Sequence, residues 1–215
     1  MIKVKEIINQ FFSEQLKKDL KFIRNEASLQ HELALYIRNA FEKAGNTPKA
    51  RVLLELPVQY LTKPLENISD VSQNKDKDDW IKKEIDIVVY DGKKNYVIEL
   101  KFVRKGAGLP KQLYHAIEDV IFCEQMVAHK KADNFFAIFL TDHSNIIKGT
   151  NTNHIYSFFN KGSNLEKPSI KTFKISELEN HPAFMKEDKK LELKEEYTID
   201  WRDADQGYKY YIISD

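Results

Sequence analysis

The residues best suited to chemistry lie in one segment of the chain, KEIDIVVYDGKKNYVIELKFV, at positions 83–103. Two apolar runs flank the sequence DGKKN at 91–95, a pattern typical of a β-hairpin. Three charged residues, Asp86, Glu99 and Lys101, interrupt runs that otherwise have the composition of buried strands. Burying a charged side chain is costly, and a functional site is one explanation for charges at these positions.

The geometry of a hairpin brings these three side chains together. A turn centred between Gly92 and Lys93 places Asp86 directly opposite Glu99, whereas a turn with Asp91 and Gly92 at its centre places them diagonally. Successive side chains of a strand point to opposite faces, and both registers give the same two faces. One face holds Asp86, Val88, Val97, Glu99 and Lys101. The other is apolar and holds Ile85, Ile87, Val89, Ile98, Leu100 and Phe102.

The charged face is typical of a metal site. Two carboxylates about 5–8 Å apart across a sheet repel each other, unless a cation lies between them or one is protonated. Carboxylate oxygens with open water positions suit Mg²⁺. Lys101, about 6.6 Å along the strand from Glu99, could orient or activate a water, or stabilise negative charge. The alternative is a solvated hairpin face, which leaves the charges within VIELKFV unexplained.

Asp86, twelve further residues and then Glu99-Leu100-Lys101 resemble the motif of the PD-(D/E)XK nuclease superfamily. The resemblance covers about residues 28–141 and implies a restriction-endonuclease-like fold with an α-β-β-β-α-β core. It departs from the family name at one position, because Ile85 stands where the motif has proline.

The resemblance also implies roles for individual residues. Asp86 and Glu99 would hold the metal, the backbone carbonyl of Leu100 would assist them, and Lys101 would support the attacking water. A glutamate from the first core helix would join the site: Glu32 is the better match because it borders the apolar stripe of that helix, and Glu26 is the weaker one. Gln112 matches a glutamine that some members carry on the helix after the lysine strand.

Periodicity predicts the elements that would position these residues. We expect helices at 4–23 and, capped by Ser28, up to Gly45, a strand at 51–61, a long polar loop at 62–83, a helix from Pro110 to about 129 and a buried strand at 134–141. The order indicates an α/β protein with a mixed central sheet flanked by helices, an N-terminal helix and C-terminal additions. In the additions, 142–166 has a loop-like composition, 168–175 and 207–213 are strand candidates, and 186–197 has the composition of a solvated helix or linker.

Composition excludes several classes of protein. The 215 residues carry 34 Lys and Arg against 33 Asp and Glu, which argues against a polybasic arm or an acidic tail. The one cysteine, Cys123, excludes an intramolecular disulfide and a Cys-rich zinc site. No apolar run approaches the length of a membrane span, and the N-terminus lacks a signal-peptide pattern. We therefore expect one cytoplasmic domain over 1–215, with its core at about 28–141 and an elaboration at 142–215.

These observations predict a Mg²⁺-dependent nuclease, with Mn²⁺ as a substitute, that hydrolyses phosphodiester bonds. DNA is favoured over RNA as the partner, a homodimer is possible, and restriction, defence and repair stay open as pathways. Lysines at 93, 94, 101, 105 and 111 could form a phosphate-facing patch. One alternative is a catalytically silent nuclease-like module that binds nucleic acid or serves assembly. Another is an unrelated interaction domain in which the hairpin charges lie on the surface.

Overall fold

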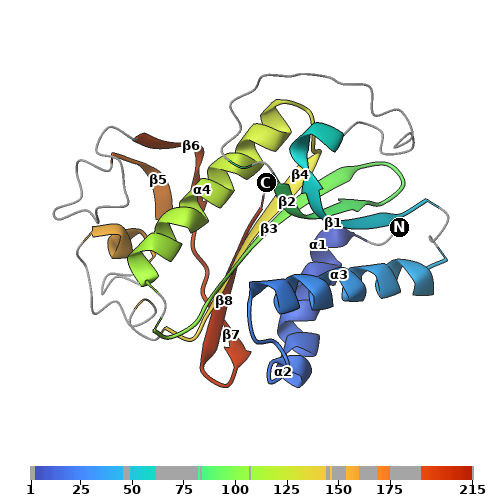
Figure 1. Cartoon of the computed structure of the whole chain (residues 1–215), viewed down its shortest axis with the longest axis horizontal. Coiled ribbons are helices and arrows are strands. Elements are labelled where there is room, and N and C mark those ends of the chain that lie inside the picture. Colours follow the sequence, from blue (N-terminus) through green and yellow to red (C-terminus); the bar gives the residue numbers. More distant parts are fainter. Residues whose placement is uncertain are drawn as a thin grey trace.

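The computed structural model describes residues 3–45, 49–61, 82, 84–106, 108–143, 146, 154–159, 169–174 and 190–214. A six-stranded mixed sheet with the order β1-β2-β3-β4-β8-β7 runs through the middle of the molecule (Figure 1). Its strands are β1 (Arg51–Pro57), β2 (Glu84–Tyr90), β3 (Asn95–Val103), β4 (Asn134–Thr141), β7 (Arg202–Asp205) and β8 (Tyr208–Ser214). The predicted class, a mixed α/β protein with a mixed sheet flanked by helices, is confirmed.

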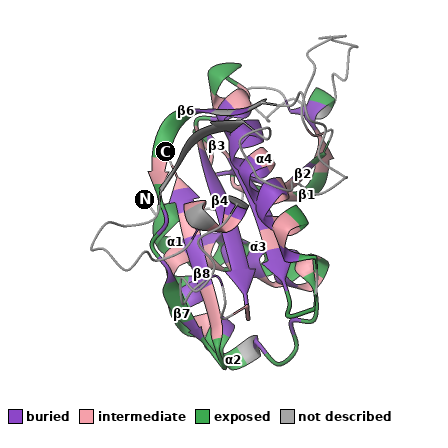
Figure 2. Cartoon of the chain, turned by 90° about the vertical axis from the view of Figure 1, so that its left-hand side faces the viewer, coloured by how far each residue is buried: buried purple, intermediate pink, exposed green. Residues whose placement is uncertain are grey.

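Helices cover both faces of this sheet. One face carries α4 (Leu109–Ala128), and the other carries the N-terminal helices (Figure 1). Those are α1 (Val4–Gln10), the π-helical turn η1 (Phe11–Gln15), α2 (Leu16–Asp19) and α3 (Glu26–Lys43). The buried residues divide accordingly into two apolar cores, and Figure 2 shows the strands buried between the two helical layers. None of the helices in the described ranges is long and apolar enough to span a membrane.

The start of α3 differs from the expectation. Asn25, not Ser28, is the N-cap: its side chain accepts from the Ser28 amide at 2.9 Å, and the Ser28 hydroxyl accepts from the Asn25 amide at 3.0 Å. This reciprocal pair satisfies two amide donors at the helix end. The helix therefore begins two residues before Ser28, and Glu26 falls in its first turn.

The hairpin register is the one with the turn centred between Gly92 and Lys93, because Ile87 pairs with Ile98. Strand β3 also pairs in parallel with β4 along its whole length, and α4 forms the crossover between them. The apolar face of the hairpin packs against the N-terminal helices, with one exception. Ile85 belongs instead to the core beneath α4, next to a point where Glu55 of β1 has a left-handed backbone, with a φ of 49°.

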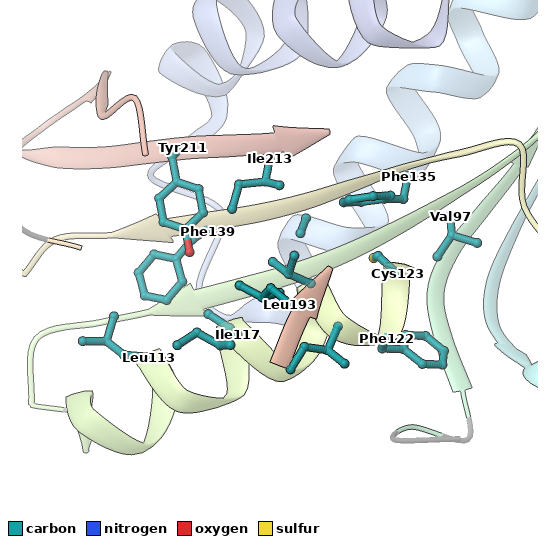
Figure 3. Close-up of a cluster of buried hydrophobic side chains, with 14 of the residues drawn as sticks. Val97, Leu113, Ile117, Phe122, Cys123, Phe135, Phe139, Leu193, Tyr211 and Ile213 are labelled. Carbon is teal, nitrogen blue, oxygen red and sulfur yellow. The ribbon is translucent and has the colours of Figure 1, made fainter. Parts of the chain in front are cut away.

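The C-terminal part of the chain completes both the sheet and the core beneath α4. Strand β8 pairs antiparallel with β4, and the rings of Tyr211 and Phe139 stack at 5.5 Å within the cluster drawn in Figure 3. Two strands, β5 (Ser169–Lys174) and β6 (Lys190–Thr198), form a separate small sheet. The expectation of a helix or linker over 186–197 is therefore wrong from residue 190 onward.

Short 3₁₀ turns lie at Val58–Tyr60 and His154–Phe158. The predicted loop at 62–83 falls outside the described residues except for Lys82, and so does most of 142–166.

Strand β6 is fastened to α4 by one buried carboxylate, Glu124. Its oxygens accept from the amides of Lys194 and Glu195 at 3.0 and 3.1 Å, and from the Tyr197 hydroxyl at 2.9 Å. Charge-assisted hydrogen bonds are stronger than neutral ones, and a buried amide that loses its acceptor is costly. The charge at position 124 thus has a structural role.

We expect Glu124→Ala to lower the free energy of unfolding by about 2–3 kcal/mol, because the β6 amides lose their acceptor. Glu124→Gln keeps one carbonyl oxygen and should lose less. Urea denaturation followed by circular dichroism measures both, with the exposed Glu195→Ala as the matched control. Equal stability of Glu124→Ala and the control would contradict the role.

Candidate functional site

The site forms where β2 and β3 separate. Their ladder ends at the pair Ile87–Ile98, although β3 continues to Val103 beside β4. Beyond this point the β3 amides that face β2 have no strand partner, and a buried amide without an acceptor is costly. Carboxylates supply the acceptors: Asp86 Oδ2 accepts from the Leu100 amide at 2.7 Å, and Glu26 Oε2 accepts from the Phe102 amide at 3.0 Å.

Asp86 and Glu99 lie side by side at the opening. Glu99 is 1% exposed, and its Oε1 accepts from the Asp86 amide at 3.3 Å. The Asp86 side chain is 23% exposed. Glu99 is therefore not an ordinary surface charge, and the two carboxylates are neighbours in the structure.

Lys101 connects the two helical layers through the opening. Its Nζ lies 3.1 Å from Glu26 Oε1 of α3 and 3.6 Å from Asp119 Oδ2 of α4. The helix glutamate in the network is thus Glu26, which the sequence favoured less. Within the described part of the chain, no hydrogen bond or ion pair joins Glu32 to these residues.

Helical geometry explains the exchange of Glu32 for Glu26. Gln30, one turn after Glu26, faces the sheet, and its Nε2 donates to the Asp86 carbonyl oxygen at 2.6 Å. At about 100° per residue, Glu32 points about 160° away from Gln30. The apolar stripe at Leu29 and Leu33 was a poor guide, because the site is at the end of the helix and not along its buried side.

Two charged residues of the network were not predicted. Lys82, two residues before the start of β2, contacts Glu99 Oε2 and lies 3.1 Å from Asp119 Oδ1 and 4.0 Å from Asp86 Oδ1. Asp119 is 5% exposed on α4. The sequence held a signal for Asp119, since it interrupts an apolar helix much as Glu99 interrupts an apolar strand. For Lys82, within a polar segment, it held none.

The other predicted residues lie apart from the ion pairs. Gln112 is on the same side of α4 as Asp119, but seven residues, or about 10 Å, nearer its start. Its role stays a prediction, and so does that of the Leu100 carbonyl. The proposed lysine patch is divided: Lys93 and Lys94 are at the start of β3, while Lys105 and Lys111 are beyond its end. Nine residues of strand, about 30 Å, separate the two pairs.

Burial and like charge set the protonation of the site. Burial raises the pKa of Asp86, although the Lys82 ammonium opposes this. Burial, followed by the Asp86 charge, raises the pKa of Glu99 well above its usual range. Burial alone would lower the pKa of Lys82 and of Lys101. The neighbouring carboxylates have the larger effect, so the pKa of each lysine is raised. The lysines therefore stay charged, while the two central carboxylates resist ionisation.

The network carries more negative than positive charge. Four carboxylates (Glu26, Asp86, Glu99 and Asp119) and two ammonium groups (Lys82 and Lys101) leave the fully ionised site with a formal charge of −2. Asp119 Oδ2 is buried and accepts no hydrogen bond. Yet among the described residues no three Asp, Glu, His or Cys side chains are spaced to hold a metal. The Lys82 ammonium lies at the point on which the carboxylates converge.

A hollow of about 330 Å³ borders the site and is lined by Glu55, Lys82, Glu84 and Asp86. Glu55 is the residue of β1 between those that pair with Ile85 and Ile87, so it lies opposite Asp86. The hollow thus leads from the surface to the partly exposed Asp86, while Glu99 remains behind it.

Fold and site together define a mixed α/β protein with a buried network of acidic and lysine side chains at a split in its central sheet. Comparison with protein-family models, with curated proteins and with solved structures finds no match for this chain.

The raised pKa of Glu99 has a consequence for stability. A carboxyl group with a higher pKa in the folded than in the unfolded chain makes the free energy of unfolding fall as the pH rises between the two values. Glu99→Gln removes the charge, so we expect it to raise that free energy at about pH 8 without divalent cations.

The gain should shrink as the pH falls toward 4.5, the usual pKa of Glu99, because the wild-type side chain is then neutral as well. Urea denaturation at several pH values measures this, with Glu195→Gln as an exposed control. Destabilisation by Glu99→Gln at every pH would contradict the expectation.

Proposed function

We propose that this protein is a metal-dependent nuclease with a restriction-endonuclease-like fold. One observation carries the proposal: Glu26, Asp86, Glu99 and Lys101 meet at the split between β2 and β3. The hairpin residues Asp86, Glu99 and Lys101 are those that the PD-(D/E)XK resemblance implies, and Glu26 comes from the helix that the resemblance implies. A buried acidic group held at a cost to stability is more typical of a functional site than of a structural one.

The order of elements supports the proposal. From α3 the chain runs through β1, β2, β3, α4 and β4, which matches the α-β-β-β-α-β order of the superfamily. The first three strands are antiparallel, and β4 joins β3 in parallel. The site lies on the two central members of this unit, so the scaffold can hold its side chains firmly.

The chain's own residues would divide the work as follows. Asp86 and Glu99 would hold Mg²⁺ or Mn²⁺, with Glu26 or Asp119 completing or bordering the site. When bound, the cation would polarise the scissile phosphate and make a bound water more acidic. Lys101, held between Glu26 and Asp119, would orient the attacking water and offset developing negative charge. Asp86, which lines the hollow, would be the ligand nearest to substrate.

Cleavage of plasmid and of oligonucleotides, both DNA and RNA, in the presence of Mn²⁺ tests the proposal. We expect cleavage by the wild-type protein and losses of about 100-fold or more in Asp86→Ala and Lys101→Ala, because metal binding and water positioning fail. Lys43→Ala, at an exposed lysine in the last turn of α3, is the matched control.

Cleavage at equal rates by Lys101→Ala and the wild type would overturn the role of Lys101. Cleavage that survives Asp86→Ala would place the activity elsewhere or in a contaminant.

A second candidate function is a catalytically silent module that binds nucleic acid. It is favoured by Lys82, whose ammonium neutralises the carboxylates that would hold the metal. Binding of DNA or RNA without cleavage under any divalent cation would support this function over the first.

A further inference from the structure

One ammonium group lies among three carboxylates at the centre of the site. Lys82 Nζ contacts Glu99, lies 3.1 Å from Asp119 Oδ1 and 4.0 Å from Asp86 Oδ1. The three acids come from β3, α4 and β2, so three separate elements direct their charge at the same point. The ammonium also lies 6.0 Å from the centre of the Phe122 ring. This is the arrangement of an internal counter-cation.

The Lys82 ammonium offsets only part of the negative charge of the three carboxylates around it. It brings one positive charge to three carboxylates, and Lys101 on the other side also has Glu26 to neutralise. Asp119 Oδ2, which lies on the Lys101 side, accepts no hydrogen bond, and its ion pair with Lys101 spans 3.6 Å. A divalent cation at the same point would bring twice the charge and would bind carboxylate oxygens directly.

The hollow beside the site offers a second position for the Lys82 side chain. That side chain is 27% exposed and lines the hollow, where Glu55 and Glu84 offer two further carboxylates. The Lys82 ammonium can therefore move away from Asp86, Glu99 and Asp119 and still lie near the carboxylates of Glu55 and Glu84. Lys101 is different: it is 14% exposed, lies between Glu26 and Asp119, and does not line that hollow.

We propose that Lys82 is an exchangeable counter-cation, which a divalent metal ion must displace toward Glu55 and Glu84 in order to bind Asp86 and Glu99. The inference rests on the proposed function, because it takes the metal site from there. It adds that the apparent metal affinity is set by competition with a residue of the chain itself. A ligand that binds only the fraction of molecules with an open site shows an affinity reduced by that fraction.

The affinity for Mn²⁺ alone, measured by isothermal titration calorimetry, tests the competition. Lys82→Gln removes the competing charge and should bind Mn²⁺ about tenfold or more tightly than the wild type. Lys82→Arg keeps a cation and should bind no more tightly than the wild type. Lys43→Gln removes an exposed lysine of α3 and controls for the change in net charge.

Acylation of amines by an N-hydroxysuccinimide ester, read out by mass spectrometry, tests the displacement in the wild-type protein itself. Without Mn²⁺ the ammonium of Lys82 is shielded by three carboxylates, so its acylation should be slow. With saturating Mn²⁺ it should become several-fold faster, while Lys101 stays slow. This measurement does not depend on the folding of any variant.

The two measurements separate this inference from the function on which it rests. Equal or weaker Mn²⁺ binding by Lys82→Gln, or an acylation rate of Lys82 that Mn²⁺ leaves unchanged, would overturn the competition and leave the metal site in place. Failure of the wild type and of Lys82→Gln alike to bind Mn²⁺ would overturn the metal site and the competition together.

Discussion

The separation of β2 from β3 after the pair Ile87–Ile98 is the feature on which the site depends. A strand that loses its neighbour exposes a row of amides, and in the interior each of them needs an acceptor. Here the acceptors are carboxylates, so negatively charged side chains lie inside the protein at the split. Because the opening passes between the two helical layers, α3 and α4 can both contribute to the same cluster.

The rest of the structure compensates for the instability that this split introduces. Strand β3 keeps its full ladder with β4, and β8 supports β4 from the other side. Apolar cores fill the space beneath α4 and beneath the N-terminal helices. Two lysines offset part of the charge, yet Asp86 and Glu99 still have raised pKa values. A rigid frame thus carries a locally unfavourable group, which is common where a protein exchanges stability for function.

The sequence predicted the parts of the site that belong to a single hairpin and missed those that come from elsewhere. The facing of Asp86, Glu99 and Lys101 followed from alternation along two strands joined by a short turn. Glu32 was ranked above Glu26 because it borders the apolar stripe. The place of Glu26 depends instead on where α3 begins, which the Asn25 cap decides. Lys82 was missed because it lies in no periodic pattern. Strand β6 was missed because its alternation is short, with Leu191 and Leu193 as the two buried apolar residues at the start of a charged run.

Local patterns in the chain were therefore enough for the class of fold, the main helices and strands, and the three charges of the hairpin. Their physical basis is short in range, since the periods of 2 and 3.6 residues need no knowledge of distant segments. Folding in three dimensions decided which of the two hairpin registers forms, which helix glutamate enters the cluster, and that Lys82 meets Asp119 across 37 residues of chain. Electrostatic contacts of this kind depend on distance in space and burial, which spacing along the chain does not encode.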